Sequence, residues 1–122
     1  MPRFLIADDH AIVIAGLRQL LLQQYPTAVV EEVGDAETLF KKIMEKEWDL
    51  VITDFNMPNM NGAELIKKVR SLDSYSFLPI LLLTTEVRQE KIQQAIDGNI
   101  TAFIKKPFDT TEFVKIVKKA LR

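Results

Sequence analysis

Short apolar runs alternate with segments of helical periodicity from one end of the chain to the other. The runs that predict strands cover residues 4–7, 28–33, 50–53, 78–83 and 100–105. Those around Val51 and Leu82 are almost entirely apolar, which is typical of strands covered on both faces. Strands that alternate with helices along a chain are the pattern of βα units on a parallel sheet. We therefore expect five β/α units.

The helical segments have recognisable ends. The first covers residues 10–24 and stops before Pro26, which lacks the backbone N–H that a helix needs to continue. Asp35 is a typical N-cap for the second, whose apolar side has Leu39, Phe40, Ile43 and Met44. The remaining helices are expected after a turn at Asn61 and Gly62, at residues 88–97, and after a cap at Asp109 or Thr110.

Composition narrows the class of protein. The 122 residues carry a formal charge of −1, and 48% of them are hydrophobic. This indicates a single globular domain over residues 1–122, and it gives no sign of the basic face of a nucleic-acid-binding protein. The chain has no cysteine, and no apolar run approaches the roughly 20 residues of a membrane span. We expect a cytoplasmic protein without a disulfide scaffold and without membrane or direct nucleic-acid contacts.

Polar side chains follow four of the predicted strands at the point where each strand ends. Asp8 and Asp9 follow the first strand, Asp54 the third, Thr84 the fourth and Lys106 the fifth. Because ligands of an open parallel sheet bind outside the carboxyl ends of its strands, we expect these groups to meet in one cleft. Clustered carboxylates repel each other, and a divalent cation such as Mg²⁺, which prefers oxygen ligands, would relieve that repulsion. The pattern predicts a binding site.

Taken one at a time, several residues at or near these strand ends have simpler interpretations. Asp8 and Asp9 by themselves would most often form a strand-end turn and a helix cap. The lone histidine, His10, is interpreted as a cap or surface residue, since metal sites usually show further His or Cys ligands. Phe103, an aromatic residue in the fifth predicted strand, would most simply pack in the core. The functional interpretation therefore depends on the whole set and its spacing.

Several motifs stand in register along the chain: Asp8-Asp9, Asp54, Met57-Pro58, Gly62, Thr84 and Lys106-Pro107. Because of these motifs, the whole chain resembles the CheY-like receiver domain of two-component response regulators. Residues 54–62 are most similar to chemotaxis members, and residues 7–10 to receivers of DNA-binding regulators. The resemblance implies a flavodoxin-like, doubly wound (βα)5 fold of the α/β class. Its five-stranded parallel sheet would have the strand order 2-1-3-4-5, with helices on both faces.

The resemblance also implies a role for each strand-end residue. Asp54 would be the phosphoacceptor, and Asp9 and Asp54 would bind Mg²⁺ or Mn²⁺ directly. Asp8 would hold a coordinated water, and the main-chain carbonyl of Asn56 would complete the metal site. A sensor histidine kinase or a phosphotransfer protein would donate the phosphoryl group, whose charge Lys106 would help to neutralise. Such a protein is not an enzyme, because it catalyses only its own phosphorylation and dephosphorylation.

A switch is the second implication of the resemblance. Thr84 would bind a phosphoryl oxygen, and Phe103 would report the change to the surface formed by the fourth helix, the fifth strand and the fifth helix. A downstream effector protein or an output domain would read that face, for which the candidates are Ile92, Phe103, Lys115 and Lys119. Asn56 and Glu86 lie two residues beyond the acceptor and beyond Thr84. Both match the chemotaxis pattern, so we expect comparatively fast self-dephosphorylation.

Other functions either share these motifs or would require different residues. The same receiver excised from a DNA-binding transcriptional regulator would carry the same motifs as a stand-alone protein. An aspartyl-phosphate phosphatase would need a second Asp where this chain has Asn56. A flavin-binding protein of this fold would need a phosphate loop where the carboxylates of Asp8 and Asp9 would repel phosphate. A receiver-like adaptor that takes no phosphate usually lacks the acceptor, the Thr or the Lys, and all three are present.

Overall fold

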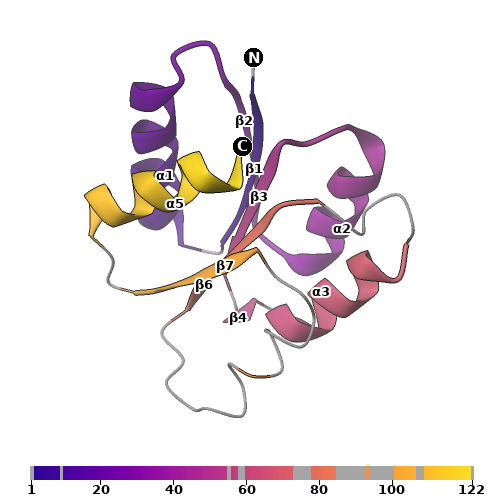
Figure 1. The fold of residues 1–122 in the computed structure, drawn as a ribbon. Helices are drawn as coiled ribbons and strands as arrows, with labels where there is room; N and C mark the ends of the chain where they lie inside the picture. Colours follow the sequence, from indigo (N-terminus) through magenta and orange to yellow (C-terminus); the bar gives the residue numbers. More distant parts are fainter. Residues whose placement is uncertain are drawn as a thin grey trace.

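The fold is organised around a five-stranded parallel sheet (Figure 1). The computed structural model describes residues 2–8, 10–54, 56–57, 60–72, 78–84, 93, 101–106 and 109–121, with the backbone alone at residues 56–57 and 60–63. The strands are β1 (Arg3–Ala7), β2 (Val29–Val33), β3 (Leu50–Asp54), β6 (Ile80–Thr84) and β7 (Ala102–Lys105). Their spatial order β2-β1-β3-β6-β7 is the predicted order 2-1-3-4-5. The flavodoxin-like α/β fold is confirmed.

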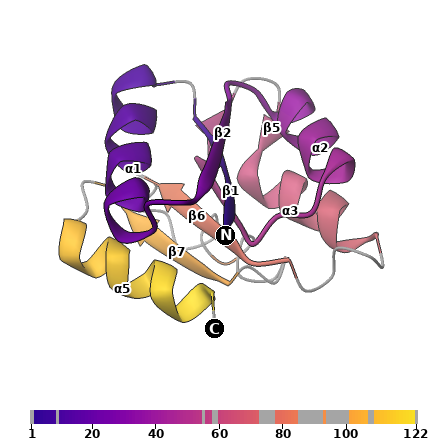
Figure 2. The same ribbon diagram turned by 90° about the horizontal axis from the view of Figure 1, so that it is seen from above.

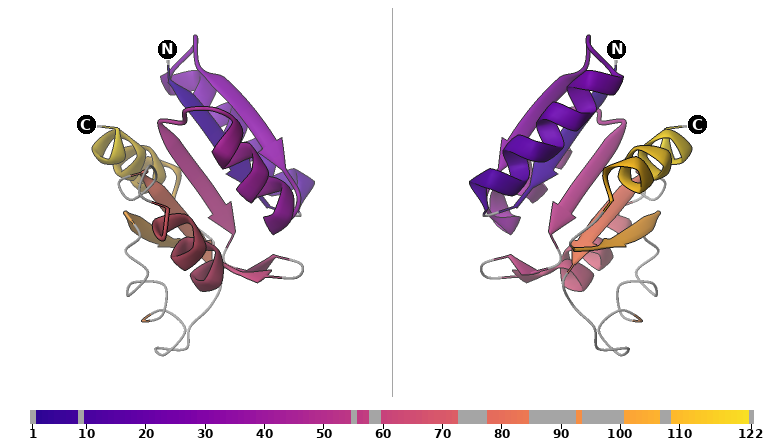
Figure 3. Two further views of the ribbon diagram at one scale, coloured as in Figure 1. Left: turned by 90° about the vertical axis from the view of Figure 1, so that its right-hand side faces the viewer. Right: turned by 90° about the vertical axis from the view of Figure 1, so that its left-hand side faces the viewer.

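A short antiparallel hairpin follows β3 and was not predicted. It consists of β4 (Asn56–Met57) and β5 (Met60–Asn61), with Asn56 paired to Asn61 and Met57 to Met60. Figure 3 shows the hairpin beyond the carboxyl end of β3, outside the main sheet. Strands of two residues carry too little hydrophobic periodicity to be recognised in a sequence.

Helices cover both faces of the sheet. They are α1 (Ala11–Gln24), α2 (Ala36–Glu45), α3 (Gly62–Arg70) and α5 (Thr110–Ala120). Figures 1 and 2 show α1 and α5 on one face and α2 and α3 on the other, so helices lie on both faces, as predicted. The helix expected at residues 88–97 lies outside the described residues, apart from Gln93. Among the described residues, no helix has the length and apolar content that crossing a membrane requires.

The caps of two helices are as predicted. The carboxylate of Asp35 accepts hydrogen bonds from the backbone N–H of Thr38 at 2.8 Å and from its hydroxyl at 3.0 Å. Asp109 accepts one from the backbone N–H of Thr111 at 2.8 Å, which settles the choice between Asp109 and Thr110 as the cap of α5. Both carboxylates therefore satisfy backbone donors that the first helical turn leaves without intrahelical partners.

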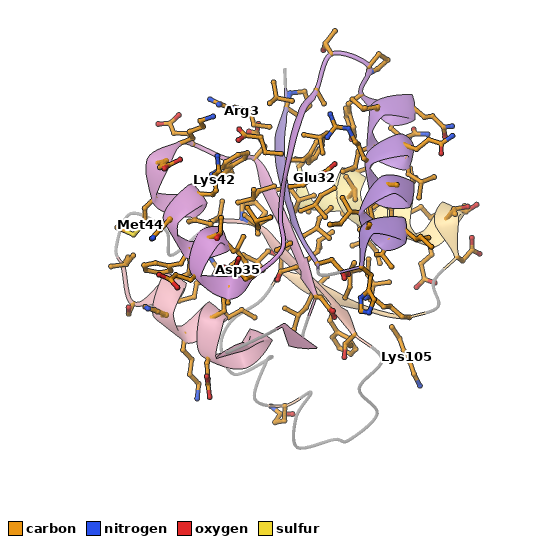
Figure 4. The ribbon with its side chains drawn as sticks, turned by 180° about the vertical axis from the view of Figure 1, so that it is seen from behind. Arg3, Glu32, Asp35, Lys42, Met44 and Lys105 are labelled. Atoms are coloured by element: carbon orange, nitrogen blue, oxygen red, sulfur yellow. The ribbon has the colours of Figure 1, made fainter. Side chains whose placement is uncertain are left out.

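One residue on the predicted apolar side of α2 is not buried. Leu39 and Ile43 pack in the core, whereas Met44 is 51% exposed and lies on the outside of the helix in Figure 4. Each residue turns an α-helix by about 100°, so Met44 lies that far from Ile43 and outside the buried stripe. The inclusion of Met44 was therefore wrong.

The apolar residues form two core clusters, one on each face of the sheet. In β1, Leu5 and Ala7 belong to the cluster under α2 and α3, and Phe4 and Ile6 belong to the cluster under α1 and α5. This alternation follows from the period of two residues in a strand. With both faces covered, the sheet leaves only its edges and strand ends to contact solvent.

Charged and aromatic residues fasten the amino end of the sheet. The backbone N–H of Arg3 donates to the Asp49 carboxylate at 2.7 Å, and the Asp49 N–H donates to the Arg3 carbonyl at 2.9 Å. The Trp48 indole N–H donates to the Lys42 carbonyl at 2.8 Å. Arg3 and Lys42 lie towards one end of the molecule in Figure 4, and Lys105 lies towards the other. These contacts fix the start of β3 relative to β1 and α2.

Candidate functional site

The carboxyl edge of the sheet brings four of the predicted strand-end residues to one place. Asp8 follows β1, Asp54 ends β3, Thr84 ends β6 and Lys106 follows β7. The backbone N–H of Asp8 donates to the Val33 carbonyl at 3.2 Å, and that of Lys106 donates to the Thr84 carbonyl at 2.7 Å. Main-chain hydrogen bonds to neighbouring strands thus hold both Asp8 and Lys106 at this edge.

The side chains at this edge form a buried ionic cluster. Asp8, Asp54 and Thr84 are all buried. The Lys106 ammonium, whose side chain is 14% exposed, lies 3.0 Å from Oδ2 of Asp8 and 3.6 Å from Oδ1 of Asp54. When all three groups are ionised, the two carboxylates and the ammonium together have one net negative charge. Buried charges need partners, so this excess favours the binding of a further cation.

His10 occupies a cap position and is exposed at the surface, as the sequence suggested, and its ring also contacts this cluster. Its backbone occupies the N-cap position of α1, but its side chain makes no capping hydrogen bond. Instead Nδ1 lies 2.8 Å from Oδ1 of Asp8, a distance at which the ring N–H donates because a carboxylate only accepts. The His10 backbone N–H donates to the same oxygen at 2.9 Å. An Asp side chain often accepts a hydrogen bond from the backbone N–H two residues later. The Asp at position 8 is therefore the sequence signal that could have linked His10 to Asp8.

Asp8 is held in its charged form. Burial alone would raise its pKa, but hydrogen bonds from the His10 N–H and from Lys106 outweigh burial and hold the pKa of Asp8 below its ordinary value. An ionised, buried carboxylate with two acceptor oxygens suits both an ammonium partner and a hard divalent cation.

The donor set fits a divalent metal ion. Asp8, His10 and Asp54 each offer a ligand atom, and these atoms lie within 4.8 Å of one another. Mg²⁺ is usually bound in proteins by one or two carboxylates, with waters and phosphate oxygens at its other positions. Asp54 and the neighbouring Asp8 supply carboxylate oxygens for such an ion at the carboxyl edge of the sheet.

Several predicted residues can be placed only in part. Asp9, Glu86 and Ile92 lie outside the described residues, and Asn56 is described by its backbone alone, in β4 next to Asp54. Phe103 lies on the edge strand β7 and is 38% exposed. Lys115 and Lys119 are exposed on α5. Phe103 is therefore not a core residue.

Residues 4–118 match the family model of the response regulator receiver domain. The chain belongs to this family. It is thus a CheY-like receiver domain of two-component signalling, which settles the class that the strand-end residues suggested.

Relatives of this receiver domain include chemotaxis proteins. The chain is 31% identical to chemotaxis protein CheY-3 of Vibrio cholerae over 106 residues, which cover 87% of this chain and 81% of that protein. It is 27% identical to chemotaxis protein CheY of Pseudomonas aeruginosa over 117 residues, 96% of this chain and 94% of that protein. The solved structure of the chemotaxis response regulator CheY4 of Vibrio cholerae matches with a TM-score of 0.88 and 33% identity, over 99% of both chains.

Proposed function

We propose that this receiver domain accepts a phosphoryl group on Asp54 from a sensor histidine kinase or a phosphotransfer protein and then changes its affinity for a partner. We take residues 1–122 as one such domain, which acts in the cytoplasm. The observation that carries the proposal is the buried Asp54 carboxylate beside the Lys106 ammonium, 3.6 Å away, at the carboxyl edge of a receiver fold. A nucleophile in such a place has a cation ready for the charge of the incoming group.

The transfer itself needs alignment and charge neutralisation more than covalent chemistry from the protein. An oxygen of Asp54 attacks the phosphorus of a phosphohistidine, the phosphorus–nitrogen bond breaks, and its electron pair returns to the imidazole of the donor. Asp8, Asp54, Asp9 and the main-chain carbonyl of Asn56 would hold Mg²⁺ or Mn²⁺, which supplies positive charge to the phosphoryl oxygens. Of these, Asp9 belongs to the set by family resemblance.

Lys106 has a second role once Asp54 is phosphorylated. The acyl phosphate carries more negative charge than the carboxylate that it replaces. Lys106, now 3.0 Å from Asp8, is close enough to exchange that contact for a phosphoryl oxygen. Such an exchange would pull on the segment after β7, because the Lys106 backbone is hydrogen-bonded to β6.

The response to phosphorylation would run through β6 and β7. Thr84, buried at the end of β6, is paired in register with Lys105, and Leu82 is paired with Phe103. If the Thr84 hydroxyl turned towards a phosphoryl oxygen, it would shift the equilibrium between two packing arrangements of the residues beside β7. An effector protein or an output domain would read Phe103, Lys115, Lys119 and Ile92. Asn56 and Glu86 would position the water that ends the signal.

The decisive experiment measures phosphoryl incorporation by intact mass. The protein is incubated with Mg²⁺ and a small phosphodonor, or with a purified histidine kinase. We expect one added phosphoryl group, lost in Asp54→Asn and lost when a chelator removes the metal. Asp109→Asn is the matched control, because Asn caps helices as well as Asp and position 109 is exposed.

Failure has a definite meaning here. A wild-type protein that binds Mg²⁺ but takes no phosphoryl group from either donor would refute the switch. A phosphate-independent, receiver-like adaptor would then be the better description.

A further inference from the structure

Helix α1 differs from the other described helices in the residues that it exposes. Its 14 residues include one charged side chain, Arg18. The outer sides of the other helices carry exposed charges of both signs, such as Glu37 and Lys41 on α2 and Glu64 and Lys67 on α3. Charged side chains keep a helix face in water, whereas the core of a protein interface has few of them. The outer face of α1 is therefore suited to contact another protein.

An apolar side chain projects from this face. Ile12 is 88% exposed, the largest exposed fraction among the large hydrophobic residues that the structure describes. Ala15 and Gly16 lie one turn further along the same side of the helix. A Cβ atom added at Gly16 would meet nothing within 4 Å. The surface after Ile12 is therefore low, and a second helix can approach it closely.

A groove of about 660 Å³ lies along the same helix, where α1 borders the edge strand β2. Its apolar lining includes Ile14, Ala15 and Leu22. The charged residues of the lining are Arg18 and Glu32, which lie 2.8 Å apart and neutralise each other. Figure 4 shows Glu32 on β2 beside α1. The groove thus has an apolar lining and no net charge.

We propose that α1 is the contact surface of a homodimer, in which the α1 helices of two copies pack antiparallel across a two-fold axis. Such an axis brings the same patch of both copies together, so the patch must offer both a projection and a recess. Ile12 is the projection and the groove is the recess. Ile12 of each copy enters the groove of the other copy beside its Leu22. In that register Ala15 of one copy lies opposite Gln19 of the other.

Charge favours a second copy over a different partner. A partner with a charged surface would lose water from its charges against this patch and would find no counter-charge there. The patch of a second copy carries only Arg18 and Glu32, which are already paired. The formal charge of the chain, −1, also leaves little repulsion between two copies. The patch is thus complementary to itself.

The contact is small, so the dimer is weak. A helix of 14 residues is about 21 Å long. One pair of helices of this length buries less surface than the roughly 1,600 Å² of a standard stable interface. We expect a dissociation constant of roughly 0.1 mM, so that the protein is monomeric when dilute and dimeric when concentrated.

Sedimentation equilibrium of the full chain tests the proposal, over concentrations from about 10 μM to about 1 mM that span the expected dissociation constant. The average mass of the wild type should rise from that of one chain towards that of two. Ile12→Glu places a carboxylate in an apolar groove twice in each dimer, so the dissociation constant should rise at least about tenfold. An acidic residue in the first turn of a helix is favourable, so the variant retains α1.

Met44→Glu is the matched control. Met44 is also an exposed large hydrophobic residue, but it lies on α2, away from the proposed contact. The dissociation constant of this variant should stay within about twofold of the wild-type value, as for a substitution outside an interface.

Disulfide formation gives a second readout, and the chain has no cysteine of its own. Ala15→Cys protein is mixed with Gln19→Cys protein under oxidising conditions. The antiparallel register places these positions opposite each other, so the mixed disulfide should form faster than either disulfide between like chains. Ala15→Cys mixed with Lys118→Cys, which is exposed on α5, gives the background rate.

Three results would overturn the proposal. The first is the mass of one chain at every concentration, which would assign the α1 face to a partner other than this chain. The second is association that Met44→Glu weakens as much as Ile12→Glu does. The third is a mixed disulfide that forms no faster than the background. None of them bears on phosphoryl transfer to Asp54, because no residue of that site takes part in the contact.

Discussion

Two clusters of lysine and carboxylate side chains lie at different places on the sheet. The side chains of one cluster are buried, and those of the other are partly exposed. At the carboxyl edge the Lys106 ammonium contacts the carboxylates of Asp8 and Asp54, and all three side chains are almost wholly enclosed. Beside α2, the Glu31 carboxylate contacts Lys46 at 2.9 Å and Lys42 at 3.3 Å, and these side chains are partly exposed. The first cluster has an excess of negative charge. The second is balanced once Glu45, 3.9 Å from Lys42, is included.

The difference in exposure predicts a different energetic role for each cluster. Water screens exposed ion pairs, so they add little to stability and tolerate changes. Buried carboxylates without enough positive charge are costly, and a protein keeps them where another cation will bind. The second cluster ties β2 to α2, whereas the two carboxylates and the ammonium of the first have a net negative charge, counted over the described residues, that a bound cation would offset.

The largest effect should come from removing the cation of the buried cluster. Lys106→Met leaves two buried carboxylates without their ammonium, and we expect it to lower the free energy of unfolding by about 3 kcal/mol in metal-free buffer. Urea unfolding followed by the fluorescence of Trp48, the single and buried tryptophan, measures this. Lys46→Met is the matched control in the exposed cluster. Equal losses for the two lysines would contradict the contrast between the clusters.

Adding the missing cation should have the next largest effect. Mg²⁺ at about 100 times its dissociation constant should raise the free energy of unfolding by about 2.7 kcal/mol, because it binds the folded chain alone. A chelator should reverse the gain, and Asp54→Asn should abolish it. Glu31→Gln should retain the full gain, since its carboxylate is in the other cluster. A gain that survives Asp54→Asn would show that the ion binds elsewhere.

Changes to the exposed cluster should be the smallest. Lys46→Met should cost less than about 1 kcal/mol, as exposed ion pairs do. Hydrogen bonds from Lys46 and Lys42 hold the pKa of Glu31 below its ordinary 4.5. The unfolded chain thus takes up this proton at a higher pH than the folded chain. The stabilisation is therefore present above 4.5 and is lost as the pH falls through the folded-state value.

Glu31→Gln tests that pH dependence. The free energy of unfolding, measured from about pH 6 to about pH 3, should fall less steeply in the variant than in the wild type. An identical slope in both proteins would mean that Glu31 contributes nothing measurable to the acid sensitivity.

Most of the sheet and its order could be predicted, because the signals are long and mutually consistent. The apolar strands around Val51 and Leu82, and the cap at Asp35, each specify a local structure that the fold preserves. The sequence could not predict that Met44 is exposed, because the apolar character of a side chain does not show where the buried side of α2 ends. The β4–β5 hairpin was missed because its pairing is only two residues long.

The site could be predicted as a set of positions but not as a set of contacts. Strand ends in a parallel sheet necessarily share an edge, so Asp8, Asp54, Thr84 and Lys106 were expected together. That Lys106 contacts both carboxylates depends on how a long side chain lies across the edge. The contact of His10 with Asp8 depends on the local backbone geometry, which a single histidine in the sequence does not predict.

The alternation of core residues along β1 limits how this receiver can change over evolutionary time. Deleting one residue from β1 would exchange the residues of its two faces, placing Ala7 where a large side chain packs. The same deletion would withdraw Asp8 from its hydrogen bond to Val33. The position of Asp8 is thus inherited together with both cores, while His10, exposed beyond the strand, can be exchanged by a single substitution. Substitutions at position 10 therefore leave unchanged the scaffold that places Asp8 and Asp54.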